Sequence, residues 1–300
     1  MAGFGAREGR EGGTMARGIF RLRLPDGTIR LARGTPETGP IGLLPPDATV
    51  ESLLRAGQSG LADAVAAVGV AVPAGATLLA PIDTQEVWGA GVTYERSRVA
   101  RMEEAVEPSI YDRVYDAVRP EVFFKSVGWR ARGPAESITV RADSGWNAPE
   151  PEFALVLTPD LEIAGYTIGN DVSSREIEGE NPLYLPQAKT YDGLCAIGPA
   201  IVPASEVELP VRIRLRVVRD GAVIVDEATS TDRLHRTFDD MLEHLGRALS
   251  FPHGVFLLTG TGIVAGSEFS LTAGDVCRIE MDGLGVLENL VESVGTLAKP

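Results

Sequence analysis

Short runs of β-branched and other apolar residues, separated by glycine, proline and aspartate, dominate the chain. Runs of this length and composition predict β-strands. The predicted strands cover residues 19–24, 28–32, 137–141, 211–219, 222–227, 255–258, 276–281 and 285–291. The first two flank Asp26-Gly27, a dipeptide that favours a tight hairpin turn.

Helical spacing of apolar residues is limited to a few segments. Short helices are predicted at 50–54 and 61–68, and a longer one at 97–118 with an interruption at Pro108. Apolar positions spaced by about 3.6 residues predict a further helix over 230–249, with Ser230 or Thr231 as its N-cap. These helices do not alternate regularly with the strands. The pattern therefore predicts a β-rich α+β fold and disfavours a doubly wound sheet or an α/β barrel.

Three carboxylates surround the apolar run 153–157. Glu150 and Glu152 precede this run, and their spacing places both on one face of an extended strand. Asp171 follows a second β-rich run at 162–169, which a turn at 158–160 could bring back beside the first. Three converging carboxylates repel one another unless a cation joins them. Oxygen ligands suit Mg²⁺, Mn²⁺ or Ca²⁺ rather than zinc, whereas a pair of solvent-exposed charges is the simpler alternative.

The polar segment 173–189 follows Asp171 and shows no clear hydrophobic period. We interpret it as a long loop, and long loops on a rigid scaffold tend to carry functional residues. Gly169 lies close to Asp171 in sequence and would allow the backbone to approach a ligand closely.

Composition narrows the choice of partners and location. The chain has 300 residues, 44% of them hydrophobic and 23% charged, with a formal net charge of −14. That charge argues against nucleic acid or an anionic membrane as a partner. There is no stretch long enough for a membrane-spanning helix, and no apolar signal-peptide core near the start. The two cysteines, Cys195 and Cys277, favour a reducing cytoplasm over a disulfide framework.

Domain boundaries follow from the same patterns. Residues 1–17 are expected to form a disordered tail, so that Met15 could be the true start. A small N-terminal domain is predicted over 18–80, and the larger part over 81–300.

Other motifs carry less information. His235 and His244 fall on the predicted helix 230–249 but are nine residues apart, which is unsuitable for a metal pair. His253 lies in a Pro-His-Gly turn, and the segment 259–262 lacks the lysine of a phosphate-binding loop. The absence of a G-x-S-x-G motif disfavours a serine hydrolase.

Five ordered motifs together resemble the fumarylacetoacetate hydrolase superfamily over residues 85–296. They are PEPEFALVL (149–157), GYTIGNDVSSR (165–175), AKTYD (188–192), TGT (259–261) and AGDV (273–276). The resemblance implies a mixed β-roll catalytic domain, a homodimer or higher homo-oligomer, and a divalent ion held by Glu150, Glu152 and Asp171. Lys189 matches the active-site lysine of the family.

One departure changes the expected chemistry. The carbon–carbon hydrolases of the superfamily carry a water-activating histidine and a partner glutamate at the positions that Ser97 and Ala100 occupy here. Serine cannot replace histidine in proton transfer near neutral pH. Residues 119–125 and 178–189 instead resemble the branch that contains 2-keto-3-deoxy-D-arabinonate dehydratase. In that branch a glutamate at the position of Glu121 is a candidate acid or base; the alternative is an exposed surface charge.

The resemblance therefore implies a Mg²⁺-dependent dehydratase of pentose catabolism, which converts 2-keto-3-deoxy-D-arabinonate to 2,5-dioxopentanoate. A bound cation would stabilise an enolate of this 2-oxo acid while the C4 hydroxyl leaves. Glu121 and Lys189 are the predicted catalytic residues. Tyr94, Ser97, Arg175 and Thr261 are predicted to bind the substrate. Two alternatives remain open: an acylpyruvate or fumarylpyruvate hydrolase, and a catalytically silent scaffold of the same fold.

Overall fold

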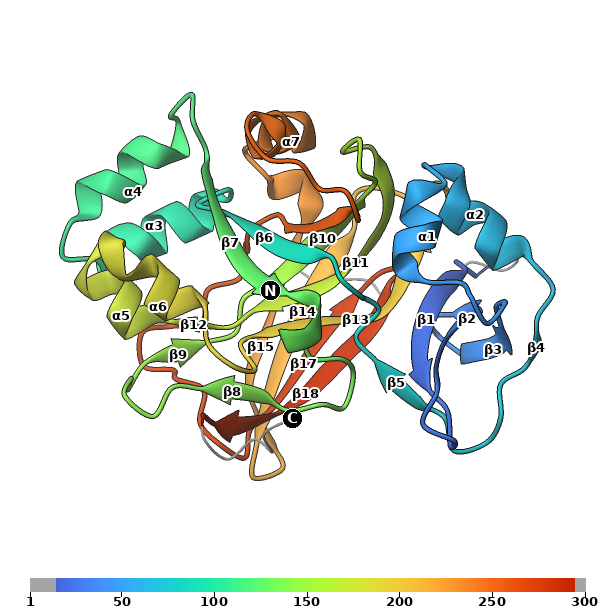
Figure 1. Ribbon diagram of the computed structural model, residues 1–300. Helices are drawn as coiled ribbons and strands as arrows, with labels where there is room; N and C mark the ends of the chain where they lie inside the picture. The colour runs from blue at the N-terminus through green and yellow to red at the C-terminus, as the bar shows by residue number, and fades with distance from the viewer. Residues whose placement is uncertain (1–14, 295–300) are drawn as a thin grey trace, which may run out of the picture.

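The computed structural model describes residues 15–294, and its larger β-sheet contains eleven strands. Ten of them follow the order β4-β3-β2-β1-β13-β11-β10-β16-β6-β7, and β5 pairs with β1 (Figure 1). The strands are β1 (Gly18–Arg23), β2 (Ile29–Thr35), β3 (Gly39–Leu43), β4 (Val70–Ala71), β5 (Thr77–Leu79), β6 (Glu86–Gly91), β7 (Glu121–Val127), β10 (Pro151–Leu157), β11 (Ile163–Asp171), β13 (Cys195–Pro203) and β16 (Val255–Leu258).

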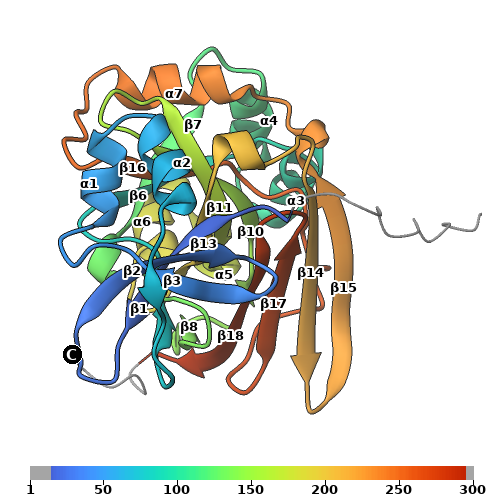
Figure 2. The ribbon, with the colours of Figure 1, turned by 90° about the vertical axis from the view of Figure 1, so that its right-hand side faces the viewer.

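A second sheet of five strands has the order β15-β14-β17-β18-β8. Its members are β8 (Ile138–Val140), β14 (Arg212–Arg219), β15 (Ala222–Ser230), β17 (Val276–Met281) and β18 (Gly285–Ser293). The β14–β15 hairpin forms one edge of this sheet (Figure 2). A short pair, β9 (Asn147–Ala148) and β12 (Ser173–Ser174), completes the β structure of the described residues.

Within the described residues, seven α-helices lie around the sheets in three groups (Figure 1). They are α1 (Val50–Arg55), α2 (Ser59–Ala66), α3 (Glu95–Glu104), α4 (Pro108–Tyr115), α5 (Arg175–Glu180), α6 (Leu185–Lys189) and α7 (Phe238–Gly246). Helices α1 and α2 lie beside the N-terminal strands, α3 to α6 form a cluster on the opposite side, and α7 stands apart. The predicted β-rich fold without regular alternation of strands and helices is confirmed.

One helix prediction and one loop prediction were wrong. The helix predicted over 230–249 begins only at Phe238, because the side chain of Thr237 accepts from Asp240 N and caps it there. His235 therefore lies before the helix that carries His244. The predicted loop 173–189 contains α5 and α6, whose short lengths hide any helical period.

The central strand β10 is buried on both faces, which explains its unbroken apolar sequence. Phe153, Leu155 and Leu157 pack in the core shared with the five-stranded sheet and α7. Ala154 and Val156 pack on the opposite face, in the core that includes α1 and α2. Because side chains alternate along a strand, burial of both faces fixes the register of β10 strongly.

The N-terminal strands join the large sheet through the pairing of Ile19 in β1 with Ile201 in β13. The division predicted at residue 80 stays a prediction. Most of the tail predicted over 1–17 lies outside the described residues, although Arg17 Nε donates to Glu206 Oε1 at 3.0 Å. Cys195 and Cys277 are both free and buried. Within residues 15–294, no helix combines the length and apolar character needed to cross a membrane.

Candidate active site

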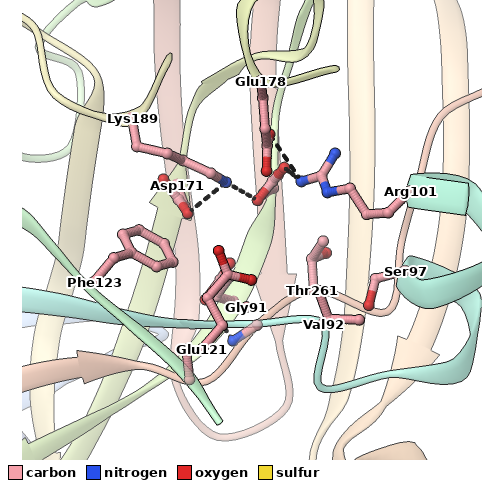
Figure 3. A pocket seen from close by; sticks show the side chains of 14 residues that line it. Gly91, Val92, Ser97, Arg101, Glu121, Phe123, Asp171, Glu178, Lys189 and Thr261 are labelled. Atoms are coloured by element: carbon pink, nitrogen blue, oxygen red, sulfur yellow. Dashed lines mark hydrogen bonds and ion pairs between the residues drawn. The ribbon is translucent and has the colours of Figure 1, made fainter. Parts of the chain in front are cut away.

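Several strands of the large sheet end at one cavity (Figure 3). Gly91 closes β6, Glu121 opens β7, and the two residues are paired across these antiparallel strands. Strands β10 and β11 are also antiparallel, so the beginning of β10 lies beside the end of β11. Helices α3, α5 and α6 add Ser97 and Arg101, Glu178, and Lys189 respectively to the cavity wall.

The predicted carboxylate trio converges at this cavity. One side-chain oxygen from each of Glu150, Glu152 and Asp171 lies within 4.8 Å of the others. All three residues are almost fully buried, with exposed fractions of 3%, 2% and 1%. The alternative of a pair of solvent-exposed charges is therefore wrong for Glu150 and Glu152.

Backbone contacts hold the trio together. Asp171 N donates to Glu150 O at 2.9 Å, and Glu150 N donates to the side-chain oxygen of Asn170 at 3.1 Å. Gly260 N donates to Glu152 Oε2 at 2.6 Å. Gly260 has a φ of +89°, and a Cβ there would lie 2.0 Å from Thr93 Oγ1. Only glycine suits this position, so the segment 259–262 is a tight turn that presents a backbone amide to Glu152.

Two lysines contact the trio, each at a different oxygen of Asp171. Lys189 Nζ donates to Glu150 Oε2 at 2.7 Å and to Asp171 Oδ2 at 2.9 Å. Lys125, fully buried on β7, forms an ion pair with Asp171 and donates to Val172 O at 2.9 Å. Lys189 also lies 5.4 Å from the ring centre of Phe123. Asp171 is thereby held by one lysine that lines the cavity and by a second that does not.

Two arginines share the remaining oxygen of Glu150. Arg101 Nη2 donates to Glu150 Oε1 at 2.8 Å, and Arg175 Nη2 lies 3.0 Å from the same oxygen. Arg175 also donates to Glu104 at 3.2 Å and does not belong to the cavity wall, although it was predicted to bind substrate. Arg101 is the arginine that lines the cavity.

The pKa values of several charged groups in the cavity are shifted. Burial, then the charges of Asp171 and Glu150, raise the pKa of Glu152 well above its usual value. Burial alone would also raise the pKa of Asp171, but Lys125 and Lys189 outweigh that effect and leave it lowered. Burial lowers the pKa of Lys189, yet Asp171, Glu150 and Glu178 raise it well above the usual lysine value.

A divalent cation fits this donor set. A cluster of charged side chains at the cavity contains six carboxyl groups but only four cationic groups. The carboxyl groups belong to Glu104, Glu121, Glu150, Glu152, Asp171 and Glu178, and the cations to Arg101, Lys125, Arg175 and Lys189. Within residues 15–294, no lysine or arginine forms an ion pair with Glu152. A hard cation beside Glu152 would supply the missing positive charge through all-oxygen ligation.

Glu121 projects into the same cavity from β7 (Figure 3). A Cβ at Gly91 would lie 2.1 Å from Glu121 Oε2, so the glycine leaves room for this carboxyl group. Burial, then the nearby charge of Glu178, raises the pKa of Glu121 to about 7. A carboxyl group with this pKa can both accept and donate a proton near neutral pH. The alternative of an exposed surface charge does not describe Glu121.

Comparison with known proteins identifies the fold. A family model for the C-terminal domain of fumarylacetoacetate hydrolase matches residues 86–292. The chain belongs to the fumarylacetoacetate hydrolase family. The predicted family and its β-rich fold are thereby confirmed.

Two curated relatives of this family member are dehydratases by name. A probable 2-keto-3-deoxyxylonate dehydratase of Haloferax volcanii is 49% identical over 216 residues, covering 71% of this chain and 74% of the relative. A 2-dehydro-3-deoxy-D-arabinonate dehydratase of Saccharolobus solfataricus is 45% identical over 213 residues, covering 69% and 72%.

A solved structure of a relative agrees with these matches. The 2-keto-3-deoxy-D-arabinonate dehydratase complexed with magnesium and 2,5-dioxopentanoate has a TM-score of 0.80 and 34% identity. The alignment covers 92% of this chain and 99% of that structure.

Of the other predicted substrate-binding residues, two line the cavity and Tyr94 does not. Ser97 and Thr261 line the cavity, but the Ser97 hydroxyl accepts from Tyr94 N at 3.4 Å, which caps α3, and donates to Tyr94 O at 2.8 Å. Thr261 Oγ1 donates to Ile263 O at 3.1 Å. Tyr94 is buried beside a neighbouring pocket instead, and burial, followed by the charge of Glu152, raises its pKa.

Sequence reasoning missed three charged residues: Arg101, Lys125 and Glu178. Arg101 falls four residues after Ser97 in a predicted helix, so helical spacing could have placed both on one face. Glu178 lies three residues after Arg175, but the segment was expected to be a loop. Nothing local marks Lys125, because β7 was not recognised as a strand.

Proposed function

We propose that this protein is a divalent-cation-dependent dehydratase that converts 2-keto-3-deoxy-D-arabinonate to 2,5-dioxopentanoate. The observation that carries the proposal is the identity of 49% and 45% to two dehydratases over more than two thirds of the chain. In the D series, the substrate names of these two relatives describe one compound. D-xylonate and D-arabinonate differ only at C2 and C3, and both centres are lost in the 2-keto-3-deoxy acid.

Mg²⁺ is the proposed ion, with Glu150, Glu152 and Asp171 as its ligands. The support is the buried carboxylate trio together with the magnesium in the related dehydratase structure. When bound, the ion would supply a Lewis acid that stabilises negative charge on the 2-oxo group of the substrate.

The side chains of the chain itself provide the remaining functions. Lys189 offers a buried positive charge for the substrate carboxylate or for the developing enolate oxygen. Glu121 moves protons, because its pKa of about 7 leaves both of its forms accessible. Ser97 and Thr261 contribute to the wall that orients the substrate.

Loss of water requires no water-activating histidine, and none of the three histidines lies at the cavity. His235 stacks on Tyr115 at a centroid distance of 4.1 Å, and His244 lies on α7. His253 pairs with Glu51 at 2.9 Å. None of these positions belongs to the cavity wall. Dehydration releases water, so the chemistry can proceed with carboxyl groups and a cation.

The proposed function is tested with purified protein, Mg²⁺ and two substrates. Incubation with 2-keto-3-deoxy-D-arabinonate should yield 2,5-dioxopentanoate, which ¹H NMR detects by its aldehyde proton. Acylpyruvates should remain uncleaved, and EDTA should abolish turnover. Efficient cleavage of acylpyruvates without conversion of the sugar acid would instead identify a hydrolase. Conversion of neither would favour a silent scaffold.

The metabolic role, the cellular location and the oligomeric state are part of the same proposal. A role in pentose catabolism and a homodimer are supported by the family resemblance. A cytoplasmic location is supported by the two free cysteines, Cys195 and Cys277. Gel filtration with light scattering tests the assembly directly.

A further inference from the structure

Glu178 is a second carboxyl group in the cavity wall, facing Glu121 from a different element. It belongs to α5, whereas Glu121 belongs to β7, and Figure 3 shows both side chains directed into the cavity. Glu178 is only 4% exposed. The two carboxyl groups are close enough for the charge of Glu178 to raise the pKa of Glu121.

The backbone around Glu178 is fixed from both sides. Ser174 caps α5 by accepting from Ile177 N at 3.3 Å. Tyr111 Oη donates to Glu178 O at 3.4 Å, and Val106 N donates to Gly179 O at 3.1 Å. Helix α5 is thereby held against the α3–α4 pair, and the carboxyl group is positioned by packing on the cluster of helices.

Arg101 pairs with Glu178 but does not need it as a partner. Arg101 Nη2 lies 3.2 Å from Glu178 Oε2, but Arg101 already donates to Glu150 at 2.8 Å and to Glu104 at 3.2 Å. The arginine would keep two carboxylate partners without Glu178. A further buried carboxylate adds repulsion to a cluster that already has excess negative charge, and such a cost is typical of functional sites.

The proposed reaction needs more proton transfers than one group readily performs. Removal of a C3 proton and departure of the C4 hydroxyl as water leaves a C3=C4 double bond. Removal of a C5 proton then gives a dienolate. Protonation at C3 and C4, with loss of the proton from the C5 hydroxyl, gives 2,5-dioxopentanoate. Apart from the released water, atoms and electrons balance without an oxidant or reductant.

We propose that Glu178 is a second proton-transfer residue that shares these steps with Glu121. This inference rests on the proposed dehydratase function. Two carboxyl groups on opposing elements can reach different carbons of a five-carbon chain fixed at its oxo-acid end. Arg101 pairs with Glu178 from one side, and the cavity leaves the other side open to the substrate.

The test compares Glu178→Gln with wild type and with Glu180→Gln, all with Mg²⁺ and 2-keto-3-deoxy-D-arabinonate. Glu180 lies on the same helix but is exposed, so its variant removes equal charge away from the cavity. Glutamine at 178 retains an oxygen that can accept from Arg101, but cannot carry the proton. Turnover of Glu178→Gln should fall by ~10²-fold or more, and Glu180→Gln should keep wild-type turnover.

Hydrogen exchange in D₂O separates a lost proton carrier from a damaged site. In Glu178→Gln, NMR of recovered substrate should still show exchange at C3, the carbon next to the 2-oxo group, because Glu121 remains. The double variant Glu121→Gln/Glu178→Gln should show no exchange at C3 beyond that of a protein-free sample. Mg²⁺ affinity and substrate affinity should stay within about threefold of wild type, as expected when only a proton-transfer group is lost.

The outcomes distinguish this inference from the proposed function. A wild-type protein that does not convert the sugar acid refutes the function itself. If wild type is active, near wild-type turnover of Glu178→Gln refutes the role of Glu178. A loss of turnover matched by an equal loss of Mg²⁺ or substrate affinity also refutes it, since Glu178 would then only position its neighbours.

Discussion

Lys189 Nζ lies 2.9 Å from Asp171 Oδ2, on the cavity side of a carboxylate whose other oxygen pairs with Lys125. Each oxygen of Asp171 is therefore paired with a lysine. Lys189 also donates to Glu150 and so bridges the two carboxylates. The Lys189 charge thus lies between two of the three proposed metal ligands.

Glu152→Gln tests the proposed metal ligands. The substitution removes a ligand charge from the trio member that no lysine or arginine of residues 15–294 pairs with. Mg²⁺ affinity should fall well over tenfold, ~2 kcal/mol or more. Isothermal titration calorimetry of wild type, Glu152→Gln and the exposed control Glu180→Gln measures the effect. Equal affinities for all three proteins would exclude Glu152 as a ligand.

Glu121→Gln tests the proton carrier on β7. Turnover should fall by ~10²-fold or more while Mg²⁺ affinity stays nearly unchanged, because Glu121 lies outside the trio. Steady-state kinetics and calorimetry on the same preparation give both quantities. Near wild-type turnover would contradict the assigned role.

The ionisation of Glu121 also predicts how stability depends on pH in the metal-free protein. Its folded-state pKa of about 7 exceeds the usual 4.5, so the folded state holds the proton more tightly than the unfolded state. The unfolding free energy should be highest below pH 4.5, as far as Glu121 determines it, and fall as pH rises to about 7. Glu104, whose pKa burial also raises to about 7, acts in the same direction.

Glu121→Gln should remove part of that pH dependence. At pH 8 with EDTA the variant should be more stable than wild type by ~1 kcal/mol, after allowance for solvent screening. Urea unfolding at pH 5 and pH 8 measures the difference. An identical pH profile in the two proteins would show that Glu121 has an ordinary pKa.

Lys189→Met should lower turnover and weaken substrate binding, because it removes a cation that faces the anionic substrate. It removes the hydrogen bonds to Glu150 and Asp171 together with the positive charge in the cavity. We expect turnover to fall and KM to rise, each by about tenfold or more, because hydrogen bonds to charged groups are strong. Lys189→Arg keeps the charge and serves as the matched variant. A change in KM alone would limit Lys189 to substrate binding.

Ser97→His should not create a hydrolase. The position lines the cavity, but Ala100 offers no carboxylate to orient the new imidazole. The hydroxyl that caps α3 is lost at the same time, which should cost ~1 kcal/mol of stability. Acylpyruvate cleavage assays and thermal unfolding measure the two effects. Efficient cleavage by the single variant would show that another group can replace the missing glutamate.

The sequence determined the features that depend on neighbouring residues. Alternation and turn residues identified the first hairpin and most strands, because strand periodicity is a local property. The spacing of Glu150 and Glu152 placed them on one face before any partner was known. Ser97 in place of histidine was equally visible, and it directed the chemistry away from hydrolysis.

Tertiary structure decided which distant residues meet. The sheet places Glu121 opposite Gly91, and only that pairing turns a residue after a proline into a carboxyl group of the cavity wall with a raised pKa. Arg101 and Glu178 meet because α3 and α5 pack together, although 77 positions separate them in the sequence. Burial and ion pairing depend on contacts between remote segments, and local patterns carry no record of them. The charge balance of the cavity was therefore decided by the fold alone.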